Sequence, residues 1–152
     1  MLVSRRSMLI AASLAAAPTP AWARRLSAGS FTHGVASGDP LTTSVILWTR
    51  FAPAPGGDGR SAYEVSERED FRRVAKRGAA TANAANDYCV KVDVRGLRPG
   101  RVYYYRFLSG GDPSPTGITR TAPDGATESL SFAFFSCCNY PFGYFHAYAH
   151  AA

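Results

Sequence analysis

Acidic residues are absent from the first quarter of this 152-residue chain, whose first carboxylate side chain is Asp39. Long hydrophobic runs are also absent, and the apolar stretch at residues 9–17 is too short to span a bilayer comfortably. The basic residues are nearly all arginines scattered among acids, without the aromatic-interleaved basic patch of nucleic-acid-binding modules. No internal repeat is visible. The sequence therefore argues against a stable membrane span, a nucleic-acid-binding module and a repeat protein.

Cysteine is scarce, and its count of three is odd. In an oxidising compartment an odd count leaves one thiol unpaired or bound to a metal. Cys89 stands alone in a strand pattern, where a cysteine is usually a small buried apolar residue. Cys137 and Cys138 are neighbours, and a bridge between neighbouring residues is far from ordinary disulfide geometry. One of these two cysteines is therefore free to act as a ligand.

The N-terminus has the three parts of an export signal. Arg5 and Arg6 belong to a charged start, residues 9–17 form an apolar middle, and a small-x-small cleavage site ends at Ala23. The adjacent arginines indicate export by the twin-arginine translocase, so we expect a periplasmic or secreted protein. Residues 1–23 are the predicted signal peptide, with cleavage after Ala23. The alternatives are an uncleaved anchor or a chance basic start.

Short β-type runs separated by Gly, Pro and Asp follow a mature N-terminal segment at residues 24–30. They predict a mainly β protein, an antiparallel sandwich of the fibronectin type III or immunoglobulin-like class at residues 31–123. Residues 67–76 fit either a helical turn or a half-buried edge strand. Residues 52–59 are predicted as a loop and residues 79–85 as an Ala-rich turn. The candidate strands are residues 31–36, 44–50, 62–66, 72–76, 88–94, 101–108 and 116–121.

Two aromatic features sharpen the sandwich prediction. Apolar side chains alternate so that Trp48 faces a different side from Leu47, and we expect Trp48 to be a buried core residue. Leu97, Pro99 and Tyr103 have the spacing of a tyrosine corner. In this motif the Tyr103 hydroxyl bonds a backbone group near Leu97 while its ring packs inward.

The strand after this corner has alternating aromatic side chains. Tyr103, Tyr105 and Phe107 are expected on the inner face of the sandwich, with Tyr104 and Arg106 outside. The alternative is a platform of tyrosines on which a sugar or a base stacks. Alternation favours packing in the core over this alternative.

The chain ends in an apolar segment of a different kind, after a predicted linker at residues 124–129. Residues 130–135 form a near-continuous apolar run, which is typical of a strand covered on both faces in an α/β domain. Cys137 lies at the carboxyl end of this strand, where ligands and catalytic groups collect. A helix start follows. Residues 130–152 are therefore predicted as the truncated strand and helix that begin an α/β domain.

These segments carry motifs that together resemble the alkaline phosphatase D (PhoD-like) family of exported phosphodiesterases and phosphomonoesterases. The resemblance covers most of the chain and depends on the order and number of the motifs. They are the twin-arginine leader, Gly34-Val35-Ala36-Ser37-Gly38-Asp39-Pro40, Val45-Ile46-Leu47-Trp48-Thr49-Arg50, Leu97-x-Pro99-Gly100 with Tyr103-Tyr104-Tyr105-Arg106-Phe107, Thr119-Arg120-Thr121-Ala122-Pro123, and Phe134-x-Ser136-Cys137-x-Asn139-Tyr140-x-x-Gly143-Tyr144-Phe145-x-Ala147-Tyr148.

The resemblance implies an N-terminal β-sandwich domain followed by a metallophosphoesterase domain that hydrolyses phosphate esters. It also implies that Cys137 is an iron ligand in a site that holds calcium as well, with Cys138 at a variable position. A thiolate suits iron better than calcium. Bound metals can lower the pKa of a water so that it attacks phosphorus near neutral pH.

The chain departs from the family after Ala152, where a second strand and further Asp, Asn and His ligands are expected. One cysteine cannot hold a centre of several metals, so we expect this N-terminal fragment to bind no metal stably and to be inactive alone. A truncated product also predicts a poorly packed tail with exposed phenylalanines. The alternative function is a secreted fibronectin type III-like binding module without a catalytic role. That alternative leaves residues 132–148 unexplained.

Three histidines offer weaker site hypotheses. His146 and His150 are four residues apart and share a helix face, but a third metal ligand is missing, so two partly exposed helix residues fit better. His33 precedes the loop at residues 34–40, which is expected to be a structural turn. The sequence does not place this loop relative to the domain junction.

Overall fold

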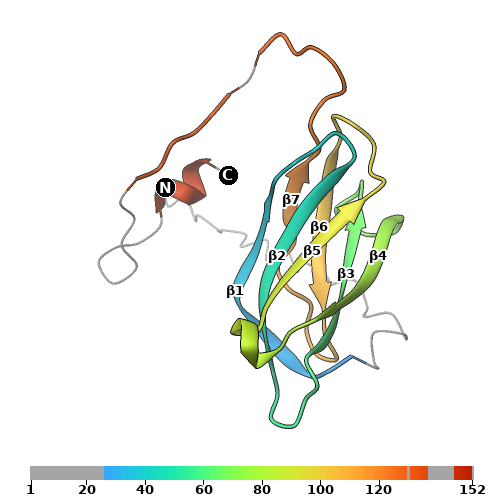
Figure 1. Cartoon of the computed structure of the whole chain (residues 1–152), viewed down its shortest axis with the longest axis vertical. Coiled ribbons are helices and arrows are strands. Elements are labelled where there is room, and N and C mark those ends of the chain that lie inside the picture. Colours follow the sequence, from blue (N-terminus) through green and yellow to red (C-terminus); the bar gives the residue numbers. More distant parts are fainter. Residues whose placement is uncertain (1–25, 130, 137–145, 152) are drawn as a thin grey trace, which may run out of the picture.

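Seven β-strands form the body of the molecule in the part that the computed structural model describes, which is residues 26–129, 131–136 and 146–151 (Figure 1). A 3-10 helix, η2 (Ala84–Asn86), joins β4 to β5, and a short helix, α1 (His146–Ala151), lies near the C-terminus. The strands are β1 (Gly29–Gly38), β2 (Ser44–Pro53), β3 (Arg60–Ser66), β4 (Val74–Thr81), β5 (Cys89–Arg95), β6 (Val102–Leu108) and β7 (Gly117–Arg120).

The strands form two antiparallel sheets that pack against each other (Figure 1). One sheet has the order β1-β2-β5 and the other has the order β4-β3-β6-β7. The chain enters the second sheet after β2, returns to the first for β5, and crosses again to β6. This arrangement is the predicted sandwich of the fibronectin type III or immunoglobulin-like class, and all seven predicted strands are present.

β4 differs most from its prediction. The sequence predicted a strand at residues 72–76 and a turn at 79–85, but the strand continues through the alanines to Thr81 and pairs with β3. The chain turns earlier, at residues 67–73, where Phe71 has a positive φ of 51°. The predicted helical turn at 67–76 is therefore wrong. Alanine and glycine are poor strand formers alone, so the partner strand decides their conformation.

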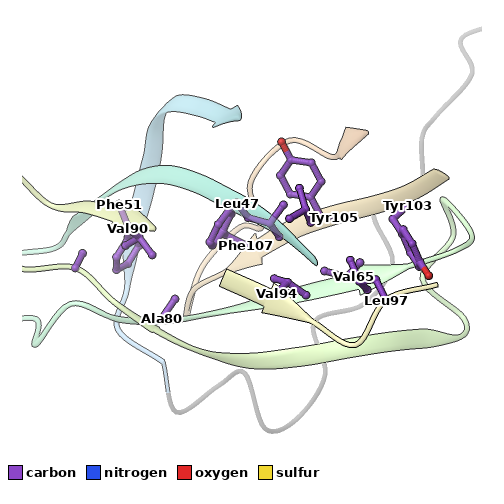
Figure 2. Packing of buried hydrophobic residues seen from close by; sticks show 12 residues of the cluster. Leu47, Phe51, Val65, Ala80, Val90, Val94, Leu97, Tyr103, Tyr105 and Phe107 are labelled. Atoms are coloured by element: carbon purple, nitrogen blue, oxygen red, sulfur yellow. The ribbon is translucent and has the colours of Figure 1, made fainter. Parts of the chain in front are cut away.

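The core lies between the sheets and is built from alternating inward side chains of facing strands (Figure 2). The inward residues of β2 and β6 are Val45, Leu47, Thr49, Phe51, Tyr103, Tyr105 and Phe107. Each apolar side chain buried in this way contributes about 1.5–3 kcal/mol of transfer free energy. The aromatic side chains of β6 pack as predicted, so the alternative of a tyrosine stacking platform is wrong for Tyr103 and Tyr105.

Trp48 is not the buried core residue that the sequence predicted. It faces away from Leu47, as the alternation predicted, but Leu47 is fully buried and Trp48 is only partly covered. Trp48 therefore lies on the outer face of the three-stranded sheet, where its cross-strand neighbours are Ala36 and Lys91. Both alternating sets of β2 contain apolar residues, so alternation separated the faces without showing which one is inside.

The tyrosine corner forms between β5 and β6. The backbone N–H of Arg98 donates a 2.9 Å hydrogen bond to the hydroxyl oxygen of Tyr103. Leu97 is buried beside it in the core, whereas Pro99 is exposed in the turn. The predicted contact between the tyrosine hydroxyl and the backbone near Leu97 is therefore present, and it fixes the crossing from one sheet to the other.

The segment after β7 is tied to the end of the sandwich at which it leaves. Ala122 N–H donates to Leu41 O at 3.0 Å, and Thr121 N–H donates to Arg101 O at 3.1 Å. The Thr121 hydroxyl also donates to Arg98 O at 2.7 Å. The β1–β2 turn, the β5–β6 corner and the end of β7 consequently meet at one end (Figure 1). We call this end the linker end.

The predicted buried strand at residues 130–135 is not formed in its described part, residues 131–135. These residues have no regular structure, and Phe132, Phe134 and Phe135 are exposed. A strand needs a neighbouring strand for its backbone hydrogen bonds, and none is present beside these residues in the described regions. The exposed phenylalanines agree with the expected poorly packed tail. None of the described helices has the length and apolar character needed to cross a bilayer.

Candidate functional site

The predicted metal ligand, Cys137, and its neighbour Cys138 lie outside the described residues, as do Arg5, Arg6 and the cleavage site after Ala23. Within residues 26–129, 131–136 and 146–151, no three His, Cys, Asp or Glu side chains are grouped so that they could hold a metal ion. The described residues alone therefore do not supply an iron or calcium site. Their polar side chains form a groove and two ion pairs within the sandwich.

The exposed histidines do not assemble a site among the described residues. His146 and His150 both lie in α1, which is six residues long, and both side chains are exposed. His33 lies in an irregular part of β1, and its Nδ1 is 2.7 Å from the hydroxyl oxygen of its neighbour Thr32. The expected turn at residues 34–40 is wrong for most of its length, because residues 35–38 pair with β2 as the second half of β1 and the turn begins only at Asp39. This turn reaches the linker end, where the Leu41 carbonyl accepts a hydrogen bond from the Ala122 N–H.

An open groove of about 660 Å³ lies between β4 and β5, the edge strands of the two sheets. Small side chains on β4 leave this space between the sheets. Cys89 lines the groove and is half-buried, which corrects the expectation of a fully buried cysteine. It starts β5 on the face opposite Val90, whose side chain is in the core. The lining residues are Ala79, Ala80, Thr81, Asn86, Cys89, Val90, Lys91, Val92 and Asp93.

A bidentate ion pair stands beside Cys89. Arg50, the cross-strand neighbour of Cys89, donates from Nη2 to Asp87 Oδ1 at 2.8 Å and from Nε to Asp87 Oδ2 at 3.1 Å. These hydrogen bonds lower the pKa of Asp87 below its ordinary value and raise the pKa of Arg50. Asp87 has a positive φ of 49°, a conformation that Asp tolerates better than most residues. The pair anchors the β4–β5 connection to β2.

A second ion pair, between Glu64 and Arg106, is buried on the outer face of the four-stranded sheet. Arg106 Nη2 and Nε donate to Glu64 Oε2 at 2.8 and 3.2 Å, and the two residues are cross-strand neighbours. The Phe71 ring covers the guanidinium at 4.2 Å. Arg106 lies on the outer face, as the alternation of β6 predicted, but it is buried there, which the alternation did not predict. The only indication of this buried ion pair in the sequence is one isolated charged residue in the middle of each of the two strands.

Residues 14–123 match the family profile described as PhoD-like phosphatase, N-terminal domain. The chain belongs to the PhoD-like phosphatase family. Its sequence is 46% identical over 131 residues to alkaline phosphatase D of Bacillus subtilis (strain 168), an alignment that covers 80% of this chain and 22% of the relative. A solved structure of PhoD superposes with a TM-score of 0.71 at 43% identity, covering 80% of this chain and 25% of that one.

The chain thus spans about a quarter or less of the length of the PhoD-like proteins it matches. The matched region contains all seven strands and ends at residue 123, just after the backbone contacts of the linker end. The sandwich is therefore the N-terminal domain of this family. The described polar sites, which are the groove and the two ion pairs, all belong to that domain.

Proposed function

We propose that this chain is the N-terminal part of an exported, metal-dependent phosphatase or phosphodiesterase that hydrolyses phosphate esters. The supporting observation is the 46% identity to alkaline phosphatase D over 80% of the chain. The described ion pairs are structural, because their charges satisfy each other within the sandwich. The sandwich accordingly serves as a scaffold, and the reacting groups come from the sequence after residue 129.

Cys137 is the proposed iron ligand in this part of the chain. A thiolate is a soft donor that suits iron, but a single thiolate does not complete a centre that also holds calcium. Such a centre supplies a Lewis acid for the phosphoryl oxygen and a water of lowered pKa. The remaining ligands have to come from residues other than those described. Export by the twin-arginine translocase, guided by Arg5 and Arg6, is part of the same proposal.

The 152-residue chain alone is expected to show no phosphatase activity. Catalysis at a phosphate requires several positive groups around the phosphoryl oxygens, and one cysteine does not provide them. The measurement is the hydrolysis of p-nitrophenyl phosphate and bis(p-nitrophenyl) phosphate by the purified chain with iron and calcium added. Turnover above that of the buffer would contradict the proposed inactivity. Alkaline phosphatase D from B. subtilis serves as the positive control.

A hybrid enzyme tests the proposed role of Cys137. In this hybrid, residues 1–152 of the chain replace the matching segment of B. subtilis alkaline phosphatase D. Cys137→Ser is expected to lose the bound iron and about 100-fold or more of the activity, because even residues that only orient a metal ligand contribute about 10–100-fold. Iron content and p-nitrophenyl phosphate hydrolysis are both measured.

Cys138→Ser is the matched control, since it removes the neighbouring thiol and nothing else. It is expected to keep both the iron and the activity. If both variants retain their iron, Cys137 is not a ligand. If Cys138→Ser loses its iron and Cys137→Ser does not, the two cysteines have been assigned the wrong way round.

The alternative hypothesis is a secreted binding module. The groove between β4 and β5 favours it, because the groove is open enough for a small ligand. A binding module would account for the sandwich as well. It does not account for family membership over residues 14–123. It also does not account for the apolar segment after residue 129, whose phenylalanines are exposed in this chain. The phosphatase proposal explains all of these features.

A further inference from the structure

The exposed large apolar side chains of the sandwich gather at its linker end. Within the described residues 26–129 they are Leu41, Val102 and Ile118, with exposed fractions of 64%, 46% and 64%. Leu41 accepts the hydrogen bond from Ala122, at the point where the chain leaves the sandwich. Val102 begins β6 at this end, and Ile118 lies in β7 four residues before Ala122. The exposed apolar surface of the sandwich is therefore concentrated where the chain leaves the sandwich after Ala122, which we call the chain exit.

The pairing of β6 with β7 arranges four of the side chains in this region on one face. Val102 lies opposite Arg120, and Tyr104 lies opposite Ile118. Tyr103 and Thr119, the alternate residues, are buried. The four residues therefore form two adjacent rows on the outer face of the sheet. We call this surface, together with nearby Leu41, the junction patch.

Arg120 is the charged residue of the patch itself, and two exposed carboxylates, Asp39 and Asp124, lie close in sequence to Leu41 and Ala122 at the same end. Arg120 within it and Arg101 beside it are exposed, and neither has an acidic side chain within ion-pair distance among the described residues. Arg98 and Arg68 of the same end are different, because Glu67 and Asp70 pair with them. A partner that covers the apolar side chains beside Arg101 and Arg120 is therefore expected to combine an apolar surface with carboxylates opposite these two arginines.

We propose that the junction patch is the docking surface for the domain that follows residue 129 in PhoD-like phosphatases. This inference rests on the proposed function. The chain is held to the sandwich up to Ala122, and residues 124–129 can extend over only about 20 Å, so the next domain must lie close to the patch. The tether also raises its effective concentration at the patch. The relatives continue for most of their length beyond this region.

A second copy of the chain fits the patch less well. A stable interface between proteins buries at least about 1,000 Å² of surface in total, and five side chains supply only part of that area. A tethered domain needs a smaller contact, because most of the entropic cost of association is already met by the covalent link. The apolar residues near the chain exit therefore indicate a partner within the same polypeptide.

The hybrid enzyme defined above tests the proposal with the double variant Val102→Glu and Ile118→Glu. Both side chains are exposed in this chain, so the double variant of the 152-residue chain is expected to keep its melting temperature. In the hybrid, the same changes place two carboxylates in the docking surface. Cleavage by a protease within residues 124–129 is then expected to be about tenfold faster than in the unsubstituted hybrid.

The matched control is Ala84→Glu with Ala85→Glu in η2, where both side chains are also exposed. This variant adds the same charge at a site away from the junction patch. Its linker is expected to be cleaved at the rate of the unsubstituted hybrid. Equal cleavage rates for the two double variants would overturn the proposal. So would an unsubstituted hybrid whose linker is cleaved as fast as that of the 152-residue chain.

Two further outcomes separate the competing explanations. If the 152-residue chain is a dimer in solution and Val102→Glu with Ile118→Glu makes it monomeric, the patch binds a second copy and the proposal is wrong. If the unsubstituted hybrid hydrolyses no phosphate ester, the proposed function is contradicted. The cleavage rates still decide the docking surface in that case, because they do not depend on activity.

Discussion

Replacing Arg106 with methionine is expected to lower the free energy of unfolding by about 3–5 kcal/mol, because the change leaves Glu64 buried without its partner. The two side chains are only 10% and 2% exposed, and their closest nitrogen and oxygen atoms are 2.8 Å apart. Methionine keeps much of the volume of arginine but none of its charge. The measurement is urea unfolding of the 152-residue chain, followed by circular dichroism.

An exposed ion pair provides the matched control. Arg68 and Asp70 are 3.0 Å apart, but their side chains are 63% and 35% exposed. Arg68→Met is therefore expected to cost no more than about 1 kcal/mol. The combined change Glu64→Leu with Arg106→Met removes both charges and is expected to recover most of the stability lost by Arg106→Met alone. A cost for Arg106→Met no larger than that for Arg68→Met would contradict the prediction.

The burial of this ion pair could not be predicted from the two strands that carry it. Alternation along β6 puts Arg106 on the outer face, which is normally solvated. Its cover is the ring of Phe71, which comes from the β3–β4 turn and depends on a positive φ at that residue. Nothing in the local pattern shows that a turn residue will fold over the sheet. The contact exists only because of the tertiary arrangement.

Features encoded within a few residues were easier to predict. The tyrosine corner spans only Leu97 to Tyr103, and its spacing alone implied the hydrogen bond that the structure contains. The strands were likewise marked by local alternation and by turn residues. The predicted β4 was too short, because its alanines form a strand only through pairing with β3. The groove beside it follows from those same small residues and was not predicted.

For the candidate site, the sequence allowed only those predictions that the family resemblance implies. Several motifs along the chain indicated the phosphatase family, and the family profile that confirms the membership matches residues 14–123, which do not include Cys137. The iron ligand itself stays a prediction. The junction patch could not be predicted from the sequence, because Leu41, Val102 and Ile118 come from three separate segments that only the fold brings to the chain exit.

Replacing Phe51 or Trp48 with alanine is expected to have very different effects on the free energy of unfolding. Phe51→Ala is expected to cost about 3–5 kcal/mol, because the ring is fully buried and its loss leaves a cavity in the core. The ring of Phe31 packs on it with centroids 5.0 Å apart and would lose that contact as well. Trp48→Ala removes a larger side chain, yet is expected to cost only about 1–2 kcal/mol, since the indole is partly solvated on the outer face. Urea unfolding of both variants measures the difference.

Tryptophan fluorescence gives an independent test of the position of Trp48 on the outer face of the sheet. The sequence has two tryptophans, so a chain that starts at Arg24 retains Trp48 alone. Iodide is expected to quench this indole in the folded chain, because the outer face of the β1-β2-β5 sheet is open to solvent. Unfolding costs in the reverse order, together with an indole that iodide cannot reach, would place Trp48 in the core. The family motif around Trp48 would then be explained by packing alone, whereas a solvent-accessible indole leaves the side chain available for contact outside the sandwich.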